Sequence, residues 1–430
     1  MATTTDFRTG LLLRWADGAP AHIPMLKQAG IQTLVVPASG NGEFKEACDK
    51  AGIATLPQEE LKTFPLSQLP ALGAASPGYV ALSTGTWPGI GRGASAGRDD
   101  EASQASREPW VDSNGYWIAY LRALYPEVPA ALLAYQAGPG AGLTPDRAVP
   151  FDTLTLALVE ARVMGGNYVL SMDPQFRKAL LAGDAKAVAA WKQLGVTAEW
   201  LTRNAAWFQK PPMPTIQALV EPGRPTAEIA NLLFRRSGSP MLTRTVPRTL
   251  PAGLLAFVTT SVRPSSFTPE VAQNLLRLAS QGCTVVTDDV SEAAWWKAAV
   301  AGHPPVKEQV DRVFYAHGKG TICAYRKRIV DPSEHALDVI DIVTHAKRPI
   351  RIWNAPSVIA VATMNGAAHL INYGTSPTRG EVQARIQGVF RKAVLHRPGL
   401  ASKDLEASVR GTTTEVFIPE ITRIATVQFS

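Results

Sequence analysis

The stretch FDTLTLALVEARVMGGNYVLSMD, residues 151–173, joins a helical pattern to a strand through a pair of glycines. Apolar residues recur at helical spacing over 152–166, and Gly165 and Gly166 are typical of a helix end. NYVLSMD, residues 167–173, then predicts a buried strand. A helix followed at once by an apolar strand favours a parallel sheet with helices packed outside it.

The same alternation continues towards the N-terminus. Six segments before residue 210 have the pattern of a strand: 10–15, 33–37, 53–56, 78–83, 130–136 and 167–173. Helical patterns lie between them at 22–30, 43–52, 115–126 and 152–166. Because a complete (β/α) barrel has eight strands, we predict an α/β fold in which residues 1–210 form a TIM-like barrel, either incomplete or with two irregular strands.

Two further domains are expected after the barrel. QKPPMP, residues 209–214, is the clearest linker, because paired prolines stop a helix and stiffen the chain. A second strand and helix alternation over 215–346 predicts a doubly wound α/β domain with a hairpin at 312–325. From residue 349 the apolar period changes to two, which predicts a small antiparallel β-sandwich over 347–430.

Composition excludes several classes of protein. Apolar residues make up 46% and charged residues 18%, which is typical of a folded chain, and no apolar run reaches the roughly 20 residues of a membrane span. The net charge of +7 is scattered along the chain, which argues against a nucleic-acid partner. Three distant cysteines and seven histidines without ligand spacing predict no disulfide framework, no metal and no cofactor. The compartment stays open, since MATTTDF also fits an initiator methionine before a mature chain whose signal peptide was removed from a secreted or periplasmic protein.

The order of the three parts, together with four quoted segments, resembles the three-domain glycoside hydrolases typified by the trimeric bacterial β-galactosidases. ALLAYQAGPG at 131–140, followed by the segment 151–173, is similar to their seventh strand, seventh helix and eighth strand. The middle segment 253–289 is similar to their glutamine-amidotransferase-like assembly module, and AAHLINYGT at 367–375 to a strand of their terminal sandwich. The resemblance implies a glycosidase that acts on a carbohydrate and a homo-oligomer of unstated stoichiometry.

The chain departs from that family at the catalytic positions. Where the resemblance places the nucleophilic glutamate, this chain has Tyr135 and Gln136, and no Asn-Glu pair ends an earlier strand. In the middle domain Cys283 begins a strand and no G-x-C-x-G elbow is present, so we expect no amidotransferase chemistry there.

Glycoside hydrolysis needs two carboxyl groups across the scissile bond, and in a barrel they lie at or after the carboxyl ends of strands. We select Asp112 and Asp173 as the catalytic pair, without deciding which one protonates and which one attacks. The alternative for each is a helix N-cap, and the same alternative holds for Asp152. Glu160 is expected on a solvated helix face.

The residues expected to hold the sugar follow the same strands or lie in the long segment between 84 and 114. They are Arg14, Trp15, Trp110, Asn114, Tyr135, Gln136 and Asp152. Tryptophan rings stack on sugar faces and arginine grips hydroxyl or carboxylate oxygens. The alternatives are a buried core position for each tryptophan and a surface ion pair for Arg14.

Two rival functions remain. The first is a non-catalytic glycan-binding or assembly protein that keeps the glycosidase architecture. The second is an unrelated α/β hydrolase or transferase, which the absence of a G-x-S-x-G elbow argues against. A phosphate loop at 85–97 is rejected because no Gly-Lys-Ser/Thr follows its glycines.

Overall fold

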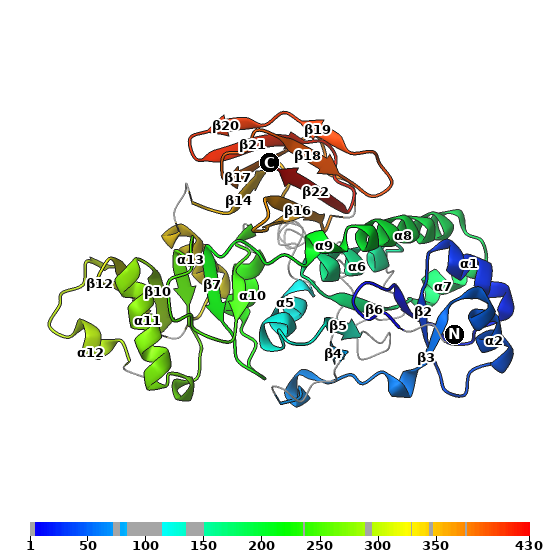
Figure 1. Cartoon of the computed structure of the whole chain (residues 1–430), viewed down its shortest axis with the longest axis horizontal. Helices are drawn as coiled ribbons and strands as arrows, with labels where there is room; N and C mark the ends of the chain where they lie inside the picture. The colour runs from blue at the N-terminus through cyan, green and yellow to red at the C-terminus, as the bar shows by residue number, and fades with distance from the viewer. Residues whose placement is uncertain are drawn as a thin grey trace, which may run out of the picture.

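The computed structural model describes residues 5–71, 78–83, 114–134, 150–234, 237–288, 295–327, 329–343, 347–374 and 376–430. Its strands form four sheets that follow one another along the chain: one in the N-terminal part, one in the middle and a facing pair at the C-terminal end (Figure 1). Within these ranges no helix combines the length and apolar character needed to cross a bilayer.

The first sheet, which we call the curled sheet, contains the six strands that the sequence predicts. They are β1 Leu12–Arg14, β2 Thr33–Val36, β3 Ala54–Pro57, β4 Tyr79–Leu82, β5 Ala130–Ala134 and β6 Asn167–Ser171. Their order is β3-β2-β1-β6-β5-β4, and every neighbouring pair is parallel. The prediction of a parallel sheet is confirmed.

The strand order shows that the sheet winds as a barrel does. Successive strands are neighbours throughout, except between β3 and β4, and the last strand β6 pairs with the first strand β1. In an open doubly wound sheet the later strands would instead move outward from β1. Among the described residues the ring stays open between β3 and β4, where Phe64 alone bridges the outer edge of β4. The domain is therefore TIM-like and incomplete.

The two faces of the curled sheet have separate cores. Leu12, Leu132 and Val169 belong to a small cluster on the concave face that contains no helical residue. Leu13 and Leu170 belong to a large cluster shared with the helices on the convex face. Those helices are α1 Ile23–Gln28, α2 Gly42–Ala51, α5 Gly115–Leu124, α6 Thr153–Val163, α7 Pro174–Leu181, α8 Ala185–Arg203 and α9 Ala205–Phe208. This separation follows from the period-two alternation of strand side chains.

The middle sheet is mixed and doubly wound. Its strands are β7 Ile216–Leu219, β8 Met241–Thr243, β9 Ala256–Val258, β10 Thr284–Asp288, β11 Lys307–Glu308, β12 Arg312–His317 and β13 Gly320–Tyr325, in the order β11-β12-β13-β10-β9-β7-β8. Its helices are α10 Ala227–Phe234, α11 Pro269–Gln281, α12 Lys297–Val300 and α13 Pro332–Ile342. The predicted hairpin is β12 with β13, whereas the short strands β8 and β11 were not predicted. After β8 the chain crosses to the other side of β7, so the winding direction reverses between β7 and β9.

The C-terminal part is the predicted antiparallel sandwich. One sheet has the order β14-β17-β21-β20 and the other β15-β16-β22-β18-β19. The strands are β14 Ile350–Trp353, β15 Val358–Ala362, β16 Ala367–Asn372, β17 Val382–Gln387, β18 Ala393–His396, β19 Lys403–Leu405, β20 Ser408–Arg410, β21 Thr413–Ile418 and β22 Ile424–Phe429.

The second sheet of the sandwich is covered on both faces. Burial alternates along β17, as expected for a strand with one face towards solvent, but every residue of β15 and β16 is buried. Ile359, Val361 and Ile371 lie in the same core as the helices of the curled sheet. The sandwich therefore packs on the N-terminal part through an apolar face, as Figure 1 shows for β16 above α6 and α9.

Candidate functional site

The carboxyl edge of the curled sheet brings two candidate segments together. Arg14 ends β1 and pairs in register with Ser171, which ends β6 two residues before Asp173. Paired residues on neighbouring parallel strands point to the same face. Because Leu12 faces the concave core, Arg14 and Ser171 also point to the concave side, at the edge where barrel enzymes hold their ligands.

Arg14 is a cation without an acceptor in the described part of the chain. Its Nε and Nη1 atoms are buried, and neither has a hydrogen-bond partner there. Burial lowers the pKa of its guanidinium, and no neighbouring carboxylate among the described residues offsets the effect. Among the described residues, Arg14 therefore does not form the surface ion pair that was its alternative role. Since a buried donor without an acceptor costs free energy, Arg14 is suited to bind an oxygen of a ligand.

Trp15 lies on the opposite face of β1. It is 1% exposed and packs in the convex core, with the His22 ring 5.6 Å away and the Arg177 guanidinium 4.7 Å from its ring centre. A stacked sugar would need an open indole face. The structure thus corrects the expectation of a sugar platform at Trp15 to the alternative, a core residue.

Asp173 begins the helix that follows β6. Its Oδ1 accepts hydrogen bonds from the backbone N of Gln175 at 2.9 Å and of Phe176 at 3.1 Å, so the N-cap alternative is present in the structure. The side chain remains partly exposed, and Oδ2 accepts no hydrogen bond from described residues. The cap fixes the carboxyl group at the carboxyl edge without using both oxygens.

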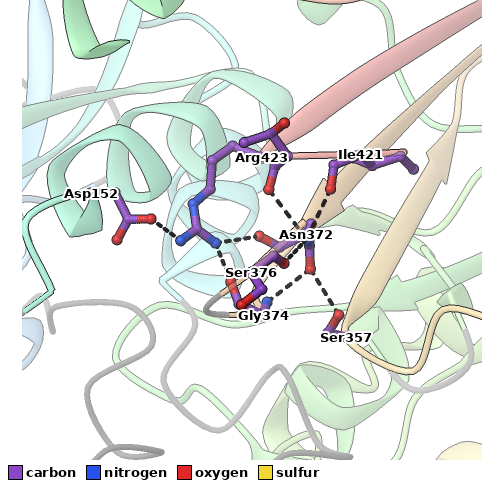
Figure 2. A network of polar contacts seen from close by, with 8 residues as sticks. Asp152, Ser357, Asn372, Gly374, Ser376, Ile421 and Arg423 are labelled. Carbon is purple, nitrogen blue, oxygen red and sulfur yellow. Dashed lines mark hydrogen bonds and ion pairs between the residues drawn. The ribbon is translucent and has the colours of Figure 1, made fainter. Parts of the chain in front are cut away.

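Asp152 connects α6 to the sandwich. It occupies the N-cap position but its side chain caps nothing among the described residues; it forms an ion pair with Arg423, which precedes β22 (Figure 2). Arg423 also donates to the carbonyl oxygens of Asn372, at 3.2 Å, and Gly374. Asp152 is therefore paired with a nine-tenths buried arginine of the sandwich, and a sugar contact at Asp152 stays a prediction.

The network around Arg423 continues through Asn372. Its side-chain amide donates to the carbonyl oxygens of Ser376 at 2.8 Å and Ile421 at 3.0 Å, and its Oδ1 accepts from Ser357 Oγ at 2.8 Å (Figure 2). These bonds hold the loops of the sandwich against the first turn of α6. The cluster has the character of a structural joint.

Asn114 and Glu160 form a second buried joint. The backbone N of Asn114 donates to both carboxylate oxygens of Glu160 at 2.9 Å, and the Tyr373 hydroxyl donates to one of them at 2.7 Å. Asn114 is 1% exposed and Glu160 is fully buried. The expectation that Glu160 lies on a solvated face is therefore wrong, and Asn114 contributes a buried backbone anchor.

The mostly apolar composition of α6 is a sequence signal that Glu160 is buried. The prediction of a solvated face for Glu160 did not use this signal. All eleven residues of α6 are buried, including Glu160 and Arg162. A helix that is apolar all round lies inside a protein, and a charge within it must find partners. Arg162 donates to the carbonyl oxygens of Arg8 and Gly10, and burial lowers its pKa to about 10.

Four candidates lie outside the described residues: Trp110, Asp112, Tyr135 and Gln136. Of the predicted site, the structure thus brings Arg14 and Asp173 to one edge, while Trp15, Asn114 and Asp152 serve the core and its joints.

Known proteins match this chain by structure and not by sequence. No family model matches the chain, and no curated protein matches it. α-L-Fucosidase isoenzyme 2 from Paenibacillus thiaminolyticus superposes with a TM-score of 0.54 at 9% identity, covering 98% of this chain and 100% of that chain. A β-galactosidase from Bacillus circulans sp. alkalophilus gives 0.55 at 9% identity, covering 98% and 99%. A catalytic mutant of a GH42 β-galactosidase from G. stearothermophilus gives 0.50 at 8% identity, covering 98% of each chain. The chain has a glycoside hydrolase-like architecture over nearly its whole length.

Proposed function

We propose that this protein, which has a glycoside hydrolase-like architecture, hydrolyses an oligo- or polysaccharide at the carboxyl edge of the curled sheet. The observation that carries the proposal is Arg14, whose Nε and Nη1 atoms are buried without an acceptor in the described residues, on the strand beside the one that leads to Asp173. A sugar hydroxyl or carboxylate supplies the acceptor that Arg14 lacks.

Asp112 and Asp173 are the proposed carboxyl pair. One carboxylic acid protonates the glycosidic oxygen, and the other attacks the anomeric carbon or activates a water. The hydrogen bonds from Gln175 and Phe176 support a role for Asp173, because they hold its carboxyl group in one orientation while leaving Oδ2 available to a substrate. Trp110, Tyr135 and Gln136 are proposed to contact the sugar.

The domain limits 1–210, 215–346 and 347–430 and a homo-oligomeric state are part of the same proposal. Each set of sheets uses strands from only one of these ranges, which supports the division. Light scattering of the purified protein tests the oligomer, and a monomeric mass would contradict it.

A non-catalytic glycan-binding protein is the second candidate. It is favoured by the carboxylates that follow the described strands of the curled sheet: Asp173 caps a helix, Asp17 is exposed beside Arg177, and Glu59 is exposed after β3. The position of the expected glutamate is occupied by Tyr135 and Gln136, which also favours a non-catalytic protein.

The test is a screen of aryl glycosides and polysaccharides with the wild type, Asp112→Asn and Asp173→Asn. The names of the similar structures make fucosides and galactosides the first substrates to try. We expect each change to lower turnover by about 10²–10⁴-fold, the usual effect of losing a general acid or base. Asp184→Asn is the matched control, because Asp184 caps α8 at the far end of α7.

The outcomes separate the candidates. If hydrolysis falls in both variants but not in the control, the result supports a glycoside hydrolase with Asp112 and Asp173 as its carboxyl pair. Hydrolysis that neither variant lowers rules out the pair. Binding of glycans without hydrolysis of any supports the second candidate.

A further inference from the structure

The middle sheet has a hollow of about 400 Å³ at the point where its winding reverses. The connection after β7 leads to β8 on one side, and the connection after β9 leads to β10 on the other. Loops that leave in opposite directions open a crevice at the carboxyl ends of the strands, and ligands of doubly wound proteins bind there. We call this cavity the switch-point hollow.

The polar wall of the hollow comes from both of these connections. Arg224, Thr226 and Glu228 follow β7, and Ser261 follows β9. Glu228 is 7% exposed and accepts a hydrogen bond from Ser261 Oγ at 2.9 Å. Two segments of the chain thus converge on a carboxylate and a hydroxyl inside one cavity.

Ser261 holds an unusual backbone conformation at this place. Its φ is 60°, in the left-handed region that a non-glycine residue adopts only with strain. Its backbone N donates to Asp288 Oδ2 at 2.8 Å, which helps to hold that conformation. Strain of this kind concentrates at ligand sites.

The wall is fixed before any ligand arrives. The backbone N of Thr226 donates to the Tyr116 hydroxyl and that of Arg224 to the Tyr120 hydroxyl, each at 3.2 Å. Both tyrosines belong to α5, so the loop after β7 rests on a helix of the N-terminal part. Thr226 Oγ1 is buried and, in the described part of the chain, has no hydrogen-bond partner.

A neighbouring carboxylate shows what a purely structural role looks like. Glu221 accepts from the backbone N of Arg263 at 2.9 Å with one oxygen and from Ser266 Oγ with the other. Both of its oxygens are engaged in holding the loop after β9. Glu228 instead lines the hollow and engages one oxygen with Ser261, which leaves acceptor capacity towards the cavity.

The geometry points to a neutral monosaccharide-sized polyol as the ligand of the switch-point hollow. The Glu228 carboxylate repels an anionic ligand, and the Arg224 guanidinium repels a cationic one. The hydroxyl groups of a neutral ligand, by contrast, donate to the carboxylate and accept from the guanidinium and from Thr226. Val262 and Ile329 give the same hollow an apolar wall for the C–H face of a sugar ring. Binding in this hollow is independent of the proposed hydrolysis, which belongs to the curled sheet.

The experiment is isothermal titration of the full chain with D-galactose, D-glucose, D-mannose, L-fucose and L-arabinose. We expect at least one of them to bind, and Glu228→Gln and Ser261→Gly each to weaken that binding about tenfold or more. Glycine adopts a φ of 60° without strain, so Ser261→Gly removes the hydroxyl and keeps the fold. Inorganic phosphate and free glycine serve as charged and zwitterionic probes.

Two controls locate the binding. Glu270→Gln changes an exposed carboxylate of α11 that pairs with Arg248, and we expect it to bind as the wild type does. Asp173→Asn reports separately on the carboxyl edge of the curled sheet, where the proposed substrate also binds, so the switch-point hollow accounts for the part of the binding that Glu228→Gln and Ser261→Gly remove. Loss of binding in Asp173→Asn but not in Glu228→Gln would overturn the inference, as would binding of only phosphate or glycine, or of none of the sugars.

Discussion

Arg14 and Trp15 show how one peptide bond separates two different roles. Arg14 points to the concave side of the curled sheet and Trp15 to the helices, because successive residues of a strand face opposite sides. The sequence suggested both as sugar contacts, since both end the first strand. At the residue scale, the face on which a side chain lies decides whether it meets a ligand or the core.

Asp173 allows its capping role to be separated from its proposed catalytic role. Asparagine caps a helix about as well as aspartate does, whereas alanine leaves the first-turn N–H groups unpaired. We expect Asp173→Ala to lower the free energy of unfolding by about 1 kcal/mol and Asp173→Asn to leave it nearly unchanged. Urea denaturation measures both, with Asp184→Ala as the matched loss of another cap. Equal losses in the two Asp173 variants would show that the carboxylate charge itself stabilises the fold.

At the scale of elements, α6 is the helix on which the domains meet. It packs against β6, carries Glu160 towards Asn114 and Tyr373, and has at its N-cap position Asp152, which pairs with Arg423. The buried charges of Glu160 and Arg162 are tolerated because each is hydrogen-bonded. These pairings fix α6 relative to α5 and to the sandwich.

The contact between α1 and α8 depends on Gly195. A Cβ atom there would lie 2.8 Å from Ala29 Cα and 3.0 Å from Gln28 O, both of which are backbone atoms that cannot turn aside. Alanine gains about 1 kcal/mol of helix propensity over glycine, but forced overpacking costs about 1–3 kcal/mol. We therefore expect Gly195→Ala to lower the free energy of unfolding, measured by urea denaturation. A more stable Gly195→Ala variant would mean that the two helices separate freely. Ala189→Gly, at an exposed position of α8, isolates the propensity effect.

At the scale of the molecule, the sandwich and the N-terminal part share one core. His369 of β16 is fully buried there, with its ring 4.8 Å from that of Phe208 in α9 and its Nδ1 2.9 Å from Thr426 Oγ1. Burial lowers the pKa of His369 to about 4 and that of His335, under the middle sheet, to about 3. Both histidines therefore stay neutral in the folded protein at pH values where they would be protonated in the unfolded chain.

This difference predicts a loss of stability in acid. Below the ordinary histidine pKa of about 6.5, these histidines bind protons in the unfolded chain but not in the folded protein. The stability that is present above pH 6.5 is therefore lost as the pH falls towards 4. One histidine contributes up to about 1.4 kcal/mol per pH unit in this window. We expect the fall in unfolding free energy between pH 6.5 and pH 5 to be smaller by about 1 kcal/mol or more in His369→Gln, measured by urea denaturation. His303→Gln, at an exposed position, is the control. A wild-type pH slope in His369→Gln would contradict the assignment.

The predicted site depended on strand ends, and the role of its residues in binding or catalysis stays a prediction. Arg14 and Asp173 were chosen because they end predicted strands, and the structure brings them to one edge. Glu160 was misjudged because its partner Tyr373 lies in a different domain, and the pairing of Asp152 with Arg423 was not foreseen for the same reason. Capping patterns describe a residue's own helix, and they carry no information about a distant side chain.

The sequence by itself determined the six strands of the curled sheet, the helices between them and the change to an antiparallel sandwich, because these follow from spacings of two and of three to four residues along the chain. Tertiary structure alone decided the faces on which Arg14 and Trp15 lie, the reversal of winding that opens the switch-point hollow, and the pairing of Asp152 with Arg423, 271 residues away. Such pairings are set by how whole sheets and helices pack, and packing joins residues that no local pattern connects.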